Sequence, residues 1–270
     1  MRIAADRFYV VTGSGFGTRD GSWIQSHLPD DGSVAFSDVT SSRAVLNLCG
    51  PLARRVLEKV TRDDVSHAGF PYMRAKTIRI GLAPVLAVRI TYVGELGWEL
   101  HIPTEYAGYV FDTLLDAGQE IGIGHAGYRA IDTLRMEKRY LYWSADITPD
   151  YNPYEAGLGF AVALGKGDFL GRDALLKIKS DGVRQELCCL LLERPLSVYG
   201  GETILCDGRV AGSTTSGNYG YTVGRSIVFG YLPTDLAHAG AFEIEAFGEL
   251  SSATCALGSP YDPQRTRILA

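Results

Sequence analysis

The chain has 270 residues, of which 46% are hydrophobic and 21% are charged, a composition that excludes a disordered or fibrous protein. Its 26 Lys and Arg residues against 31 Asp and Glu residues give a net charge of −5, which argues against a nucleic-acid binder that depends on a basic surface. No apolar run approaches the ~20 residues that a membrane-spanning helix needs, so we expect no membrane partner.

The first part of the chain is predicted to mix strands and helices. Strands are expected where apolar and polar residues alternate, and helices where apolar residues recur every three to four positions. In chain order, these elements are a strand at 8–12, a helix at 20–28, a short strand at 33–36, a helix at 52–60, strands at 77–80, 85–92 and 98–102, and helices at 105–118 and 128–140. The strand at 8–12 is apolar on both sides, which predicts a place inside a sheet.

Beyond residues 177–184 the composition shifts, and only strands and turns are predicted. The expected strands are 186–192, 202–205, 210–213, 227–231, 242–246 and 252–256. Short strands at this spacing indicate a small barrel or sandwich. We therefore expect an α+β domain over 1–180 and an all-β domain over 185–270.

Cysteine and histidine usage predicts neither a disulfide framework nor a metal site. The five cysteines form no Cys-x-x-Cys pair and are interpreted as reduced thiols. The histidines His27, His67, His101, His125 and His238 lack metal-ligand spacing and are expected to be ordinary surface or core residues. The start of the chain shows no signal-peptide or transit-peptide pattern, so we expect a cytoplasmic protein.

The glycines Gly13, Gly15 and Gly17 between a predicted strand and helix suggest a dinucleotide-binding loop at first sight. In that motif the third glycine would fall at position 18, which is Thr18. A glycine-rich turn is the better interpretation, and we expect no flavin site in this chain.

The stretch from Ile90 to Leu100 places Tyr92 and Glu99 on the two sides of a tight Gly-x-x-Gly turn. A carboxylate here could accept two N–H bonds from a flat heterocycle with an amino-pyrimidine edge. A carboxylate that simply faces water explains the same pattern, and the spacing alone favours that interpretation. In the predicted helix at 128–140, Asp132 and Arg135 can face each other, which a salt-bridged amphipathic helix also explains.

Taken together, several stretches resemble the tetrahydrofolate-binding aminomethyltransferase family of the glycine cleavage T-protein. They are Gly50-Pro51-x-Ala53, Tyr92-Val93-Gly94-Glu95-x-Gly97-Trp98-Glu99, Ala130-Ile131-Asp132-x-Leu134-Arg135-x-Glu137, Asp146-Ile147-Thr148-Pro149, Asn152-Pro153-x-Glu155-Ala156-Gly157-Leu158, Phe169-Leu170-Gly171-Arg172 and Gly208-Arg209-Val210-Ala211-Gly212. The particular residues of these motifs are more similar to the folate half of sarcosine and dimethylglycine dehydrogenases than to the free T-protein.

The resemblance implies an α+β fold that contains a ferredoxin-like region, followed by a small β-barrel, with tetrahydrofolate as cofactor. It implies that Glu99 holds the pterin ring, with Tyr92 and Tyr140 beside it. It also implies pterin contacts at the end of the first strand, at Val10 and Thr12.

Two departures from the family pattern affect the site. The family's arginine aligns with Ile131, and Arg129 is the nearest substitute. The family's catalytic aspartate aligns upstream of Met1, so no catalytic residue is assigned, and the chain is expected to correspond to the last two-thirds to three-quarters of a folate domain.

Three functions follow from the resemblance. The chain is expected to be a tetrahydrofolate-dependent aminomethyltransferase-type enzyme that takes a carbon unit from a small N-methyl or aminomethyl donor and needs an upstream partner. The alternatives are a non-catalytic folate-binding or regulatory subunit, or a C-terminal fragment of a flavoenzyme like sarcosine dehydrogenase. A flavin-containing protein or a second copy of this chain is expected as partner. Self-association or docking onto an upstream fragment is expected to cover the edge of the strand at 8–12.

Overall fold

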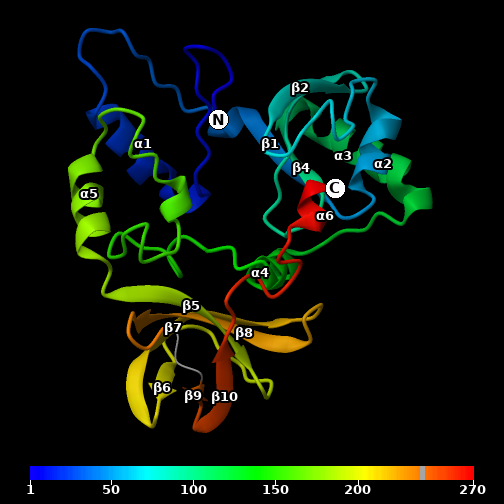
Figure 1. Ribbon diagram of the computed structural model, residues 1–270. Helices are drawn as coiled ribbons and strands as arrows, with labels where there is room; N and C mark the ends of the chain where they lie inside the picture. The colour runs from blue at the N-terminus through cyan, green and yellow to red at the C-terminus, as the bar shows by residue number, and fades with distance from the viewer. Residues whose placement is uncertain (238–240) are drawn as a thin grey trace. The chain divides into compact units, whose positions relative to one another are not determined.

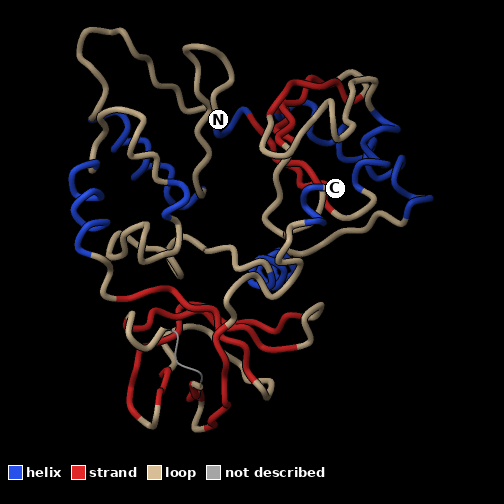
Figure 2. The backbone as a smooth tube through the Cα atoms, viewed as in Figure 1, coloured by secondary structure: helices blue, strands red, loops and turns tan. Residues whose placement is uncertain are grey.

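The computed structural model describes residues 1–237 and 241–270, which form two compact units (Figures 1 and 2). The first unit comprises residues 1–91, 95–125 and 266–270, and the second comprises 92–94 and 126–265. His238 lies outside the described residues. The division into domains near residues 180–185 stays a prediction, because residues 126–184 here belong to one unit with the strands that follow them.

A four-stranded antiparallel sheet in the order β1-β4-β3-β2 forms the centre of the first unit. Its strands are β1 (Arg43–Cys49), β2 (Ala75–Ile80), β3 (Ala83–Val88) and β4 (Gly97–Pro103). The helices of this unit are η1 (Ser14–Phe16), α1 (Gly17–Ser26), η2 (Thr40–Ser42), α2 (Ala53–Val60), η3 (Thr104–Tyr106), α3 (Ala107–Gly118), η4 (Gln119–Ile121) and α6 (Thr266–Leu269). This sheet occupies the region where the resemblance implies a ferredoxin-like unit.

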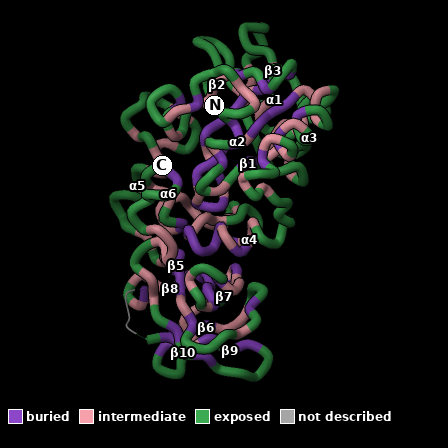
Figure 3. The backbone as a smooth tube through the Cα atoms, turned by 90° about the vertical axis from the view of Figure 1, so that its right-hand side faces the viewer, coloured by how far each residue is buried: buried purple, intermediate pink, exposed green. Residues whose placement is uncertain are grey.

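One face of this sheet packs on the helices α2 and α3. Trp98, Leu100 and Ile102 of β4 are buried in a core that includes residues of both helices. Figure 3 shows buried chain in purple around the labels α2 and β1. Because successive side chains of a strand point to opposite faces, Glu99 and His101 lie on the other face of the sheet. The candidate ligand-binding residue Glu99 therefore lies on the face of the sheet opposite the helices α2 and α3.

The predicted strand at 8–12 is wrong. Phe8 forms an isolated bridge with Arg2, and the amide of Tyr9 donates to the carbonyl of Met1, so the segment pairs locally instead of joining the sheet. Phe8, Val10 and Val11 are 68%, 65% and 57% exposed. The strand edge that was expected to attract a partner is therefore not formed by these residues.

Three other segments of the first unit differ from the structure predicted for them. Residues 33–36 form no strand, because the amide of Ser33 donates to the side chain of Asp31 in a local turn. The strand expected over 85–92 ends at Val88. The strand β1 was not predicted, although its inward-facing residues alternate with exposed ones.

A closed six-stranded barrel in the order β10-β5-β8-β7-β6-β9 dominates the second unit, which confirms the predicted small barrel. Its strands are β5 (Gln185–Leu192), β6 (Thr203–Cys206), β7 (Arg209–Gly220), β8 (Arg225–Pro233), β9 (Phe242–Ala246) and β10 (Glu249–Cys255). The strand β7 is far longer than the predicted 210–213, and it bends at a register shift between Thr214 and Ser216.

Two helices and a short 3-10 turn complete the second unit. They are α4 (Tyr128–Glu137), η5 (Gly159–Ala161) and α5 (Arg172–Asp181), of which α5 was not predicted. The helix α4 packs on β7 and β8 and ends before the predicted residue 140, because Arg139 takes a left-handed φ of 57°. No helix within residues 1–237 and 241–270 is long and apolar enough to cross a membrane.

Candidate functional site

The residues expected to hold the ligand are shared between the two units. Glu99, Val10 and Thr12 belong to the first unit, whereas Tyr92, Arg129 and Tyr140 belong to the second.

Glu99 sits in the middle of the sheet on β4, opposite Asn47 of β1 and Val88 of β3. Its side chain is 24% exposed, and its Oε2 atom lies 3.6 Å from Nε2 of His101. This distance is longer than a normal hydrogen bond. The carboxylate therefore lies on a strand that is paired on both sides, with acceptor capacity left for a ligand.

The N-terminal segment reaches this part of the sheet through Tyr9. The Tyr9 hydroxyl lies 3.3 Å from Nδ1 of His101, and the two rings meet edge to face with 5.3 Å between their centroids. Val10 and Thr12 are exposed, and the Thr12 hydroxyl donates to the carboxylate of Asp20. The pterin contacts predicted for Val10 and Thr12 stay predictions.

Sequence reasoning missed Tyr9 and His101 as parts of this cluster. The two-residue spacing of Glu99 and His101 on a predicted strand was the available signal, since it places both side chains on one face. The contact with Tyr9 had no such signal, because 92 positions separate it from His101 in the sequence.

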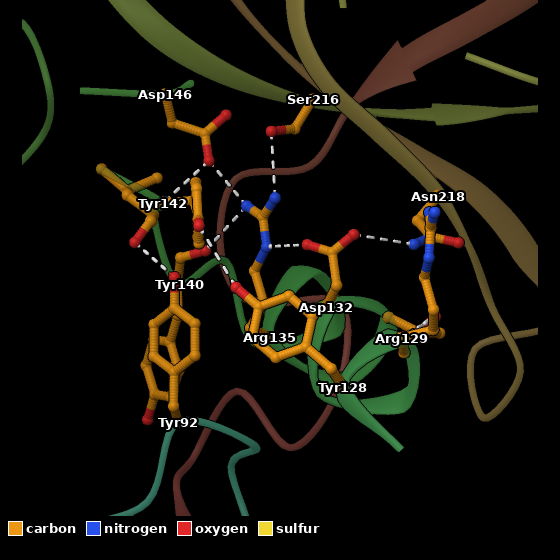
Figure 4. Close-up of polar contacts among 12 residues, drawn as sticks. Tyr92, Tyr128, Arg129, Asp132, Arg135, Tyr140, Tyr142, Asp146, Ser216 and Asn218 are labelled. Carbon is orange, nitrogen blue, oxygen red and sulfur yellow. Dashed lines mark hydrogen bonds and ion pairs between the residues drawn. The ribbon is translucent and has the colours of Figure 1, made fainter. Parts of the chain in front are cut away.

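In the second unit, Tyr92 and Tyr140 come together as an aromatic pair (Figure 4). Their rings are stacked with 5.9 Å between centroids and 18° between planes. The Tyr92 hydroxyl donates to the carbonyl of Leu141. Burial raises the pKa of the Tyr92 phenol to about 12, so the ring is neutral at physiological pH.

The guanidinium of Arg135, which is 3% exposed, fixes the backbone beside this pair. Its Nη1 atom donates to the carbonyl of Tyr140 at 3.2 Å, and the amide of Tyr140 donates back to the carbonyl of Arg135 at 2.8 Å. Its Nε donates to Asp132 at 2.9 Å, which confirms the predicted pairing along one helix face. Its Nη2 donates to the Ser216 hydroxyl at 3.0 Å (Figure 4).

Asp146 completes this buried network from the segment after α4. Its Oδ2 atom accepts from Nη1 of Arg135 at 2.6 Å and from the amide of Tyr142 at 2.8 Å. Its Oδ1 atom accepts from the Thr215 hydroxyl at 2.6 Å, and its carbonyl accepts from Tyr231 at 2.9 Å. These contacts bind the segment around Tyr140 to the barrel.

Arg129 lies outside this buried network. It is exposed in the first turn of α4, the helix that also carries Asp132 and Arg135 (Figure 4). Its assignment as the substitute for the family arginine at Ile131 stays a prediction. The described residues contain no cluster of His, Cys, Asp and Glu side chains that could hold a metal ion.

Comparison with known protein families gives two matches along the chain. The model described as the GCVT N-terminal domain matches residues 1–166. The model described as the glycine cleavage T-protein C-terminal barrel domain matches residues 185–262.

Two curated proteins are similar to the chain over nearly its whole length. Mitochondrial dimethylglycine dehydrogenase of Rattus norvegicus is 38% identical over 268 residues, which cover 97% of this chain and 31% of that protein. The mitochondrial pyruvate dehydrogenase phosphatase regulatory subunit of Mus musculus is 34% identical over 267 residues, which cover 92% of this chain and 30% of that protein. The chain thus spans about a third of the length of these relatives.

A solved structure shares the fold. The crystal structure of the glycine cleavage system aminomethyltransferase T from Bartonella henselae superposes with a TM-score of 0.79 at 22% identity, and the match covers 92% of this chain and 67% of that chain. The combination of mixed sheet, helices and closed barrel described above is therefore an established fold.

Proposed function

The chain belongs to the glycine cleavage T-protein family, and from this membership and the geometry of its site we propose that it binds tetrahydrofolate in one-carbon transfer. The observation that carries the proposal is Glu99, a partly exposed carboxylate held in the middle of a sheet.

The residues present fit a pterin ring in two respects. The amino-pyrimidine edge of a pterin offers adjacent N–H donors, and an ionised carboxylate is an acceptor-only group that can take both. The stacked pair of Tyr92 and Tyr140 offers aromatic surface of the kind that flat heterocycles contact. We propose that Glu99, Tyr92 and Tyr140 bind the ring, with Arg129, Val10 and Thr12 as further contacts.

Tetrahydrofolate supplies, when bound, a nucleophilic nitrogen that accepts a carbon unit. The residues of this chain bind and orient the ring, and their contribution is to hold the reacting nitrogen in place. The similarity to dimethylglycine dehydrogenase supports a small N-methyl or aminomethyl compound as the carbon donor, with a flavin-containing protein as partner.

A second candidate function has its own support. The similarity to the pyruvate dehydrogenase phosphatase regulatory subunit favours a non-catalytic, regulatory role for the same fold. In that case the chain would bind tetrahydrofolate without turnover, and binding would change its affinity for a partner protein.

Calorimetric titration with tetrahydrofolate under reducing conditions tests the proposed function. We expect saturable binding, and no binding at millimolar ligand would contradict both candidates. An assay of carbon-unit transfer in the presence of a flavin-containing partner protein then distinguishes the two candidate functions. Folate-dependent turnover favours a transferase, and binding without turnover favours a regulatory subunit.

A further inference from the structure

Glu99 and His101 share one face of β4, yet their environments differ sharply. The Glu99 side chain is 24% exposed, whereas the His101 side chain is 1% exposed. His101 lies opposite Val45 of β1 and Leu86 of β3, and Tyr9 covers its ring. A buried imidazole therefore lies beside the carboxylate that is proposed to bind the pterin, on the same face of the sheet.

The two nitrogens of His101 have different surroundings. Nδ1 lies 3.3 Å from the Tyr9 hydroxyl. Nε2 is buried and has no hydrogen-bond partner among the described residues, and it faces Oε2 of Glu99 at 3.6 Å. Buried polar atoms without partners are rare and call for an explanation.

The chemistry of these groups selects one tautomer. If Nδ1 carried the proton, the lone pair of Nε2 would face a carboxylate oxygen, and two acceptors would repel each other. If the Tyr9 hydroxyl donates to Nδ1, the proton sits on Nε2 and points at Glu99. An imidazolium would also present an N–H to Glu99, so both favourable states direct a donor at the carboxylate.

We propose that His101 is a positioning residue for Glu99, and that Tyr9 sets the His101 tautomer that this role requires. This inference rests on the proposed function, because it concerns how the pterin-binding carboxylate is oriented. Once a hydrogen bond from Nε2 forms, it holds Oε2 on the sheet side and leaves Oε1 and the remaining lone pairs of Oε2 for the donors of the ring.

The distance of 3.6 Å between Nε2 of His101 and Oε2 of Glu99 fits a hydrogen bond that forms only when the ligand is bound. Polar contacts at functional sites are often long without ligand and shorten when the ligand is bound. A small movement of Glu99 toward His101 would give the buried N–H a partner. Ligand binding and formation of this bond would then strengthen each other.

The first test needs no ligand. Nitrogen-15 NMR of the side-chain imidazoles in the full chain, assigned with a His101→Gln variant, reports which nitrogen of His101 carries the proton. We expect a proton on Nε2, and we expect Tyr9→Phe to shift His101 toward a mixture of tautomers. A proton on Nδ1 alone would overturn the proposal.

The second test uses two substitutions of His101, whose side-chain amides reach different positions of the imidazole that they replace. The amide of Gln extends as far as Nε2 and can still donate to Glu99, whereas the shorter amide of Asn reaches only the position of Nδ1. We expect His101→Asn to raise the Kd for tetrahydrofolate about tenfold, the scale of one hydrogen bond, and His101→Gln to stay close to the parent. A purely structural role would make both variants equally weak.

The outcomes separate this inference from the proposed function. A parent chain that does not bind tetrahydrofolate overturns both. A parent that binds, with His101→Asn and His101→Gln binding equally well or equally badly, overturns only the role of His101. If either His101 variant fails to fold, Tyr9→Phe decides: we expect a Kd raised about threefold, and an unchanged Kd would contradict the proposal.

Discussion

Arg135 and Asp146 form an ion pair with 2.6 Å between Nη1 and Oδ2, and both side chains are buried. One comes from α4 and the other from the segment after it, and Ser216 and Thr215 of β7 bond to the two partners. The pair therefore ties the segment that carries Tyr140 to the barrel.

Asp146→Asn should destabilise the protein strongly. The substitution removes the fully buried carboxylate that pairs with Nη1 of Arg135 and leaves the partly exposed Asp132 as the remaining ionic partner of the guanidinium. We therefore expect a loss at the lower end of the about 3–5 kcal/mol that breaking a buried ion pair costs. Urea unfolding monitored by circular dichroism measures the change in the free energy of unfolding.

Asp173→Asn is the matched control for this substitution. Asp173 is 96% exposed and pairs with Arg172 at 3.9 Å, so we expect no measurable change in stability. Equal effects of the two substitutions would show that the Asp146 contacts do not stabilise the second unit.

One strand of the barrel was predicted well from its alternating residues and the turn that follows it. The strand at 242–246 was predicted with its observed bounds, because alternating residues are followed by the turn at Phe247 and Gly248. The strand at 8–12 failed because an apolar run shows that a segment can pair but not what it pairs with.

The site was predictable in its residue types but not in its buried network. In α4 the apolar pattern predicts Ile131, Leu134 and Met136 as inward residues, and Met136 is indeed buried, but Arg135 and Glu137 are also more deeply buried than Ile131 and Leu134. Glu137 accepts from two amides more than 80 positions away, at 2.7 and 3.0 Å, and Arg135 bonds to β7. Spacing within a helix carries no information on such distant partners.

The raised pKa of Tyr92 makes stability fall at high pH. Below pH 10 the phenol is neutral in both the folded and the unfolded chain and contributes no pH dependence. Between pH 10 and about 12 only the unfolded chain releases the proton, so the free energy of unfolding decreases as pH rises.

The Tyr92→Phe variant tests this assignment directly. It should lose an ultraviolet absorbance change near pH 12 and show a shallower loss of stability above pH 10. If the late part of the titration is the same in parent and variant, the buried phenol is not that of Tyr92.

Arg129→Ala tests whether this arginine replaces the one that the family has at Ile131. Arg129 is exposed on α4, so its removal should change the stability by no more than about 0.5 kcal/mol. We expect weaker tetrahydrofolate binding, measured by calorimetry, with unchanged unfolding. Arg209→Ala, which removes another exposed arginine, should leave both quantities unchanged.

Glu99→Gln is the sharpest test of the ring-binding site. The substitution keeps the shape of the side chain but removes its charge and replaces one acceptor with a donor, which would face the N–H groups of the pterin. We expect tetrahydrofolate binding to weaken by roughly 1.5–3 kcal/mol, the scale of a hydrogen bond to a charged group. Calorimetric titration of parent and variant measures this change directly.

Glu105→Gln provides the control, because Glu105 is exposed in η3 of the same unit and should leave the affinity unchanged. Glu99 is partly exposed and its Oε2 lies 3.6 Å from His101 Nε2, too far for a normal hydrogen bond, so Glu99→Gln should unfold like the parent. Weaker binding without a loss of stability would then come from the ligand contact itself. If Glu99→Gln binds tetrahydrofolate as tightly as the parent, Glu99 does not hold the pterin ring, and the role of His101 behind it fails with it.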